Sequence, residues 1–192
     1  YLSERIAKKF ELPFEEVSVG FKYICEKMLA ENVLLGGEES GGYGWVGGIP
    51  ERDGILNAIL ITEMLSKTNR KLSQFVDDLT KRFGKSYYLR RDIKLRQPVD
   101  KKKFTKEIKS LFMRSNQRIK EIKDYDGIKI IFEDDRWLLI RPSGTEPVIR
   151  TYSETDSVMK TKKLLNLAGK VCCNFVNPTS TDGAKTSPNA HV

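Results

Sequence analysis

The sequence predicts an α/β protein: a partial three-layer α/β/α domain, followed by a smaller α+β two-layer domain with an antiparallel sheet. In the first half, helical periodicity alternates with short apolar runs, which is typical of α/β layering with parallel strand pairing. In the second half, apolar runs separated by turn residues follow one another between two helical patterns. That order is typical of helices on one face of an antiparallel sheet. A chain of 192 residues can hold one large or two small cores.

The first module is expected over residues 1–83. Its pattern is interrupted at 36–48, which holds seven of the fourteen glycines and therefore predicts a loop with close backbone approach. Apolar spacing and breakers predict helices at 2–10, 20–30, 53–67 and 72–82, with strands around Glu16 to Val19 and at 32–36.

The second module is expected over residues 99–176. Residues 84–98 precede it as a connecting strand that ends at Pro98, and residues 177–192, with almost no apolar content, are expected to be a flexible tail. Hairpins are predicted at Asp124 to Gly127 and at Glu133 to Arg136. Within the module we expect helices at 101–114 and 156–175, and strands at 119–122, 128–133, 136–141 and 148–153.

Composition excludes several classes of protein. Hydrophobic residues make up 39% and charged residues 31%, so neither a disordered chain nor a membrane protein is favoured. The net charge of +8 comes from residues 84–127, which hold 14 basic and 6 acidic side chains. Apolar spacing within 101–114 indicates that its lysines form the solvated face of a helix, and no nucleic-acid motif accompanies them. Three cysteines without metal spacing predict reduced thiols and a cytoplasmic location.

Residues 141–147, with the sequence Arg-Pro-Ser-Gly-Thr-Glu-Pro, join two predicted strands. They bring together a fixed positive charge, two hydroxyls and backbone N–H groups between two prolines that restrict the loop ends. Arg150 adds a second guanidinium from the following strand. Guanidinium groups, hydroxyls and amides that converge on one loop suit a phosphate dianion. The alternative is a solvated hairpin loop, since Pro, Ser and Gly are ordinary turn residues.

Residues 36–42, with the sequence Gly-Gly-Glu-Glu-Ser-Gly-Gly, form the second informative stretch. Carboxylates and a hydroxyl in a glycine-rich loop can bind vicinal hydroxyls of a sugar. The alternative is a flexible turn with exposed acidic side chains.

Both stretches resemble motifs of the α-D-phosphohexomutases, the family of phosphoglucomutase and phosphomannomutase. Arg141 to Pro147, followed by Ile149-Arg150, is similar to the family's phosphate-binding loop, and Gly-Glu-Glu-Ser-Gly is similar to the sugar-recognition loop of its third domain. Val19-Gly20-Phe21-Lys22 and Arg52-Asp53-Gly54-Ile55 match in the same order. The resemblance covers about residues 1 to 175 and implies a C-terminal portion: an N-terminally incomplete domain 3 over 1–83 and domain 4 over 99–176.

The resemblance also implies roles for individual residues. Lys22 would contact the reacting side of the ligand, although it could be a surface lysine, and Arg52 would shape the cleft. Asp53 could simply cap the following helix. The family's phosphate contacts fall on Arg141, Ser143, Gly144, Thr145 and Arg150, and its sugar contacts on Glu38 and Ser40.

The sequence lacks the family's phosphoserine loop and its Mg²⁺-binding loop. The resemblance therefore implies no catalytic residue and no metal ligand in this chain; Mg²⁺ and a glucose 1,6-bisphosphate-type activator would act in the complete enzyme. Hexose phosphates and the missing N-terminal domains would be its partners. A proton relay is left open, with Lys22 and Tyr43 as candidates. Within the resemblance, the sequence Gly-Glu-Glu-Ser-Gly favours glucose or mannose phosphates over glucosamine phosphates as substrates. Alternatives are a stand-alone phosphosugar-binding module and a basic nucleic-acid-binding domain.

Overall fold

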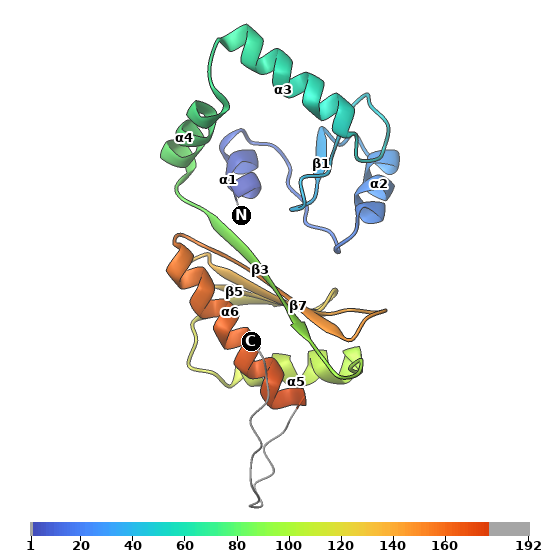
Figure 1. The fold of residues 1–192 in the computed structure, drawn as a ribbon, viewed down its shortest axis with the longest axis vertical. Helices are drawn as coiled ribbons and strands as arrows, with labels where there is room; N and C mark the ends of the chain where they lie inside the picture. Colours follow the sequence, from blue (N-terminus) through green and yellow to red (C-terminus); the bar gives the residue numbers. More distant parts are fainter. Residues whose placement is uncertain (1, 177–192) are drawn as a thin grey trace, which may run out of the picture. The chain divides into compact units, whose positions relative to one another are not determined.

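Residues 2–176 are described by a computed structural model, in which the chain divides into two units (Figure 1). One unit comprises Tyr1–Tyr87 with Thr155–Ser157, and the other comprises Tyr88–Glu154 with Val158–Val192. The tail predicted for 177–192 lies outside the described residues.

The first unit contains four helices and one small sheet, and all four predicted helices of this half are confirmed. The strand predicted around Glu16 to Val19 is wrong, because the described residues between α1 and α2 contain no strand. The predicted parallel pairing is also wrong, since β1 and β2 pair antiparallel. The elements are α1 (Leu2–Lys9), α2 (Phe21–Ala30), β1 (Leu35–Gly37), β2 (Tyr43–Trp45), α3 (Gly54–Thr68) and α4 (Leu72–Phe83).

A tight turn explains why β1 pairs with its neighbour in sequence. The Glu38 N–H donates to the Gly42 carbonyl over 2.9 Å, and the Gly41 N–H donates to the Glu38 carbonyl over 3.1 Å. Gly41 has a φ of 91°, which glycine adopts without strain. The turn sends the chain directly back, whereas parallel pairing requires a crossover of about a dozen residues or more. The glycine-rich stretch is therefore a hairpin rather than a connection between two layers.

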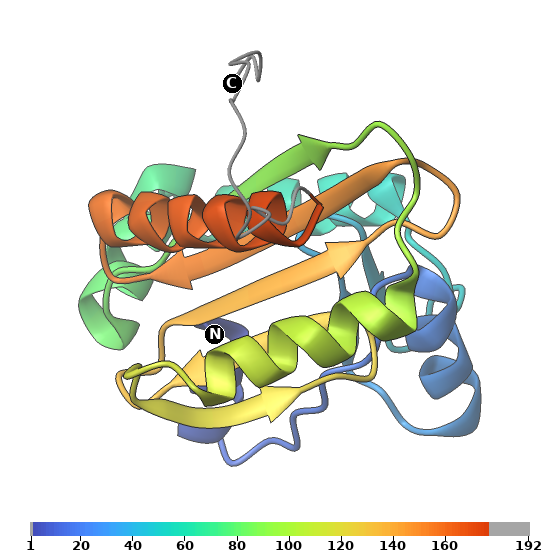
Figure 2. The same cartoon turned by 90° about the horizontal axis from the view of Figure 1, so that it is seen from below.

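The second unit has two layers, with helices on one face of an antiparallel sheet, as predicted. The sheet has the strand order β3-β7-β6-β5-β4. α5 and α6 lie on the same face of it (Figure 2). The elements are β3 (Tyr87–Lys94), α5 (Lys101–Met113), β4 (Ile119–Lys123), β5 (Ile128–Phe132), β6 (Trp137–Pro142), β7 (Val148–Thr155) and α6 (Val158–Val176).

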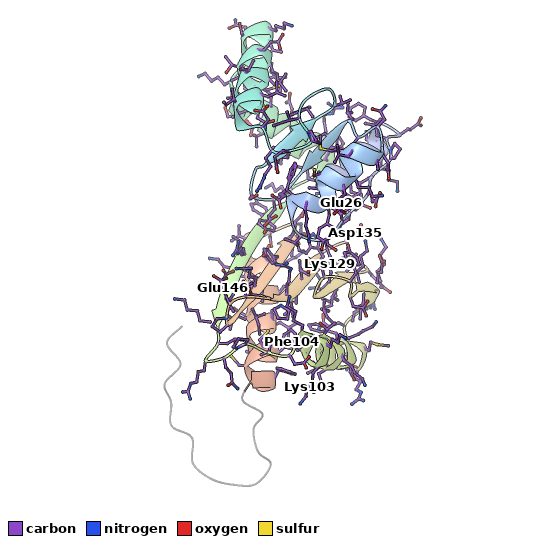
Figure 3. All side chains as sticks on the ribbon, turned by 90° about the vertical axis from the view of Figure 1, so that its right-hand side faces the viewer. Glu26, Lys103, Phe104, Lys129, Asp135 and Glu146 are labelled. Atoms are coloured by element: carbon purple, nitrogen blue, oxygen red, sulfur yellow. The ribbon has the colours of Figure 1, made fainter. Side chains whose placement is uncertain are left out.

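The core of this unit lies between the sheet and the two helices. On α5, Phe104, Ile108 and Phe112 recur at intervals of four residues and are at most 2% exposed. Lys101, Lys102, Lys103 and Lys106 of the same helix are exposed. Phe104 lies on the inner side of the helix and Lys103 on its outer side (Figure 3). The sheet and α6 complete the core with Ile128, Ile130, Phe132, Leu138, Ile140, Ile149, Leu164, Leu165, Ala168, Val171 and Cys172.

The turn between β4 and β5 depends on Gly127. This residue has a φ of 79°, and a Cβ there would lie 2.6 Å from the Ile140 carbonyl oxygen. A side chain at this position would thus meet the backbone of β6, which cannot move aside without breaking the sheet. Gly127 therefore fixes the turn against the end of β6.

Gly127→Ala is expected to lower the free energy of unfolding of the second unit by about 1–3 kcal/mol, the usual cost of holding a strained backbone conformation. Urea unfolding monitored by the fluorescence of Trp137, in a Trp45→Phe background, measures this change. Gly169→Ala is the control, because a Cβ there meets nothing within 4 Å and the residue lies inside α6. This control should stabilise the unit by about 0.5–1 kcal/mol. Equal effects of the two substitutions would contradict the packing described for Gly127.

Candidate functional site

The loop between β6 and β7 is short and exposed at its tip. The Ser143 N–H donates to the Val148 carbonyl over 2.8 Å, and the Val148 N–H donates to the Glu146 carbonyl over 2.8 Å. Ser143 is buried, with 7% of its surface exposed, whereas residues 144–147 are exposed. The loop predicted to bind phosphate thus presents Gly144 and Thr145 to solvent.

The Ser143 hydroxyl is engaged within the loop. Its Oγ accepts hydrogen bonds from the Thr145 N–H at 3.4 Å and from the Glu146 N–H at 3.3 Å. Bonds of this length are weak, so the two amides can exchange them for a stronger acceptor. The Gly144 N–H has no hydrogen-bond partner among residues 2–176. The loop therefore offers three backbone donors that an anion can use.

Arg141 and Arg150 are register partners in the pairing of β6 with β7, which places both side chains on the same face of the sheet. Side chains in such a pair have Cβ atoms about 4.5–5.5 Å apart, and like charges directly opposite each other are destabilising. The face concerned is opposite to α5 and α6, because the neighbouring Ile140 and Ile149 point into the helix-covered core. Two guanidinium groups thus meet at the base of the loop.

Each of these arginines is held by a carboxylate. Arg141 Nε donates to Asp126 Oδ1 over 2.8 Å, and both side chains are about a fifth exposed, at 21% and 22%. Both terminal nitrogens of Arg141 lack a hydrogen-bond partner among the described residues. Arg150 Nη2 donates to Glu146, whose side chain is 59% exposed, so solvent screens that pair. Glu146 lies at the edge of the second unit (Figure 3).

Two features of this loop escaped the sequence prediction. Asp126, which orients Arg141, comes from the turn that Gly127 fixes against β6. Lys101, the first residue of α5, has its Nζ 2.9 Å from the point that a Cβ of residue 144 would occupy. Neither residue carries a local signal, because each is brought to the loop by the packing of separate elements.

In the first unit, the hairpin brings Glu38 and Arg52 together. Arg52 Nη1 lies 3.4 Å from Glu38 Oε2, and only 15% of the Glu38 side chain is exposed. A Cβ on Gly42 would lie 2.5 Å from Cδ of Arg52, so this glycine lets the arginine cross the hairpin. The Arg52 guanidinium also bonds to Glu51 over 3.1 Å and lies 5.3 Å from the Phe21 ring centroid. Arg52 thus contacts both the Glu38 and the Glu51 carboxylates.

The other predicted residues of the first unit are not joined to this pair. Ser40 is exposed in the turn of the hairpin and has no hydrogen bond to a described residue. Lys22 Nζ lies 4.6 Å from the Tyr23 ring centroid, in the first turn of α2. Asp53 accepts a hydrogen bond from the Leu56 N–H over 2.8 Å and caps α3, which confirms the capping alternative for that residue.

Within residues 2–176, no group of three or more His, Cys, Asp or Glu side chains could hold a metal ion. None of the helices in this range is both long enough and apolar enough to cross a bilayer.

Two family descriptions match the chain. Residues 1–83 match "Phosphoglucomutase/phosphomannomutase, alpha/beta/alpha domain III", and residues 95–166 match "Phosphoglucomutase/phosphomannomutase, C-terminal domain". Together they cover most of the described chain.

Similar proteins carry related names. The phosphoglucomutase/phosphomannomutase of Thermococcus kodakarensis is 34% identical over 172 residues, which are 88% of this chain and 35% of the relative. The phosphoglucosamine/phosphogalactosamine mutase of Sulfurisphaera tokodaii is 30% identical, over 88% of this chain and 36% of the relative. A crystal structure of a Thermus thermophilus putative phosphomannomutase superimposes with a TM-score of 0.68 at 29% identity, covering 89% of this chain and 34% of that structure. The chain thus spans about a third of the length of these relatives.

Proposed function

Because this chain belongs to the phosphoglucomutase/phosphomannomutase family, we propose that it is the sugar- and phosphate-binding part of a phosphohexomutase. Such an enzyme interconverts hexose 1-phosphates and hexose 6-phosphates. We assign the phosphate that does not react to the β6–β7 loop, with Arg141, Gly144, Thr145 and Arg150 as its contacts. We also assign Ser143 to this phosphate: its Oγ accepts weak hydrogen bonds from the Thr145 and Glu146 N–H groups, and its O–H group can donate to the anion.

The observation that carries this proposal is the cross-strand pair of Arg141 and Arg150 below a loop with an unpartnered amide. Two guanidinium groups directly opposite each other cost stability unless anions neutralise them. Asp126 and Glu146 supply that neutralisation within the protein, and the terminal nitrogens of Arg141 remain available. A dianionic phosphate can take bonds from those nitrogens and from the Gly144 N–H simultaneously.

We assign sugar recognition to Glu38 and Ser40, with Arg52 in contact with Glu38. Lys22 is assigned to the reacting side of the ligand. A carboxylate accepts two hydrogen bonds from vicinal hydroxyls, and it does so best when a guanidinium fixes its rotamer. The Glu38–Arg52 contact supports this assignment. Tyr43 and Lys22 are the candidates for proton transfer to a sugar hydroxyl.

The proposed reaction requires groups outside the described residues. A phosphoserine of the complete enzyme transfers its phosphoryl group to the free hydroxyl of the hexose phosphate, and the serine hydroxyl takes the proton. The resulting bisphosphate turns around, and the serine regains the phosphoryl group from the other end. Residues 2–176 offer no Mg²⁺ ligand cluster, so we place the metal, and the partner domains that hold it, elsewhere in the enzyme. A glucose 1,6-bisphosphate-type activator would phosphorylate that serine.

The sugar class is proposed to be glucose or mannose, from the Glu-Glu pair of the hairpin. Free thiols at Cys25, Cys172 and Cys173 support the proposal of a reducing, cytoplasmic setting. The complete enzyme should convert glucose 1-phosphate or mannose 1-phosphate with a higher kcat/KM than glucosamine 1-phosphate. The opposite order would overturn the sugar assignment without affecting the phosphate loop.

The division of labour is tested with the 192-residue chain itself. It should bind glucose 6-phosphate yet show no turnover of glucose 1-phosphate in a coupled assay, whereas the complete enzyme should show turnover. Turnover by the isolated chain, or a complete enzyme without any mutase activity, would refute the proposal. In the second case the alternative of a non-catalytic phosphosugar-binding module would hold.

A further inference from the structure

We propose that Lys101 is a further phosphate-binding residue of the β6–β7 loop and that it brings to the loop a positive charge that no carboxylate of the described residues offsets. The inference rests on the proposed function, because it concerns the same phosphate. It adds a residue from a different element, 43 positions earlier in the chain than Gly144.

The first feature is the position of Lys101. Lys101 begins α5, and Asp100 caps this helix by accepting a hydrogen bond from the Lys103 N–H over 2.9 Å. The Leu95 N–H donates to the Pro147 carbonyl over 2.8 Å, which ties the segment leading into α5 to the loop. The start of α5 and the β6–β7 turn accordingly lie at the same end of the second unit (Figure 2). Lys101 reaches the loop from the helix-covered side, opposite to the two arginines.

The second feature is the contact between Lys101 and Gly144. The point that a Cβ of residue 144 would occupy lies 2.9 Å from Lys101 Nζ and 3.5 Å from its Cε. Apart from the glycine and its chain neighbours, no other atom of the described residues lies within 4 Å of that point. The ammonium group therefore occupies the space beside Gly144 at the loop tip. Lys102 and Lys103 place no atom there, although they carry the same charge.

The third feature is the balance of charge around the loop. Arg141 is paired with Asp126, Arg150 with Glu146, and Arg90 with Asp92. Arg90 bonds to Asp92 and holds the pKa of that carboxyl below its usual value, with a smaller contribution from Arg150. Lys101 has no ion pair or hydrogen bond with any residue in the described range. Lys101 is thus a cation beside this loop whose charge no carboxylate of the described residues offsets, and a phosphate would be its counter-ion.

The fourth feature is the glycine at position 144. The φ of Gly144 lies outside the left-handed region, so alanine could adopt this backbone conformation. A methyl group there would, however, displace the Lys101 ammonium. Gly144 therefore leaves room for the Lys101 ammonium group beside the loop.

The test is a titration of the 192-residue chain with glucose 6-phosphate, in which the amide resonance of Thr145 gives the dissociation constant. Lys101→Met should weaken binding about fivefold, the upper end of what an exposed charge pair contributes. Lys101→Arg should restore most of the affinity, because the positive charge returns. Lys102→Met is the matched control: it removes the same charge from the next residue and should leave the dissociation constant within about twofold.

Gly144→Ala gives an independent readout through a double-mutant cycle. If this substitution acts by displacing Lys101, Gly144→Ala combined with Lys101→Met should weaken binding no more than the stronger of the two single changes. Additive losses would overturn the inference, and so would equal effects of Lys101→Met and Lys102→Met. Binding by the unaltered chain with no effect of Lys101→Met would sink this inference alone. No binding by the unaltered chain would sink the proposed phosphate site together with it.

Discussion

Arg141→Ala is expected to weaken the binding of glucose 6-phosphate by about 1.5–3 kcal/mol, the contribution of a hydrogen bond to a charged group. The substitution removes the two terminal nitrogens that face no protein partner. It also leaves the Asp126 carboxylate, 22% exposed, without the guanidinium that neutralises it beside the anion. Both effects act in the same direction, so we expect the loss to fall in the upper half of this range.

Arg136→Ala is the matched control for Arg141→Ala. Arg136 precedes β6 and is paired with Asp134, so the same kind of side chain is removed near the opposite end of one strand. This variant should bind glucose 6-phosphate as the unaltered chain does. Arg141→Lys should be nearly as damaging as Arg141→Ala, because an ammonium group cannot reproduce a two-pronged contact. Equal affinities of Arg141→Ala and Arg136→Ala would remove Arg141 from the site.

Phe104→Ala is expected to lower the free energy of unfolding of the second unit by about 3–5 kcal/mol, the cost of truncating a buried aromatic side chain. Phe104 is fully buried and sits edge-on against Phe175 with the ring centroids 4.9 Å apart. Its removal opens a cavity between α5, α6 and the sheet, which the rigid strands cannot fill. Phe104 is thus a buried apolar residue that directly follows the three lysines at the start of the same helix.

Urea unfolding of the second unit measures this loss. In a Trp45→Phe background, Trp137 is the remaining tryptophan and reports on the second unit. Leu111→Ala is the control from the same helix, since Leu111 is 47% exposed, and it should cost less than about 1 kcal/mol. A Phe104→Ala variant no less stable than Leu111→Ala would contradict the predicted facing of α5.

The second unit could be predicted from the sequence because its signals are local. Apolar residues recur every four positions on α5, and the Asp-Gly and Asp-Asp turns separate the apolar runs that became β4, β5 and β6. β4 to β7 each pair with their neighbours in sequence, and β3 alone pairs with a distant strand, β7. Leu111 was the exception: it shares the apolar spacing of α5 but lies at the edge of the buried stripe and is exposed.

The first unit was predicted less well, because the sequence marks apolar segments but not their partners. The run around Glu16 to Val19 is apolar enough for a strand, yet the structure forms no strand there. The glycines at 36–48 indicated close backbone approach, and the structure shows what approaches: the side chain of Ile24 at Gly36 and that of Arg52 at Gly42. Chain turning at Gly41 then gave an antiparallel hairpin in place of a parallel pair.

The candidate phosphate loop was found from residue type and spacing, whereas its supporting charges were not. Arg141 and Arg150 stand nine residues apart, and a hairpin of this length brings them into register. Asp126 and Lys101 reach the same loop from the β4–β5 turn and from α5. Their assignment depends on how β5 and α5 pack beside β6, which no sequence motif records.

We propose above all that the β6–β7 loop binds the phosphate group of a hexose phosphate. The most direct measurement is a pair of amide-resonance titrations of the 192-residue chain, one with glucose 6-phosphate and one with glucose at the same concentrations. We predict that glucose 6-phosphate shifts the resonances of Gly144, Thr145 and Arg150, that inorganic phosphate shifts the same set, and that glucose shifts none of them. Unchanged resonances at these three residues at saturating glucose 6-phosphate would show that the loop is only a turn and would contradict the claim.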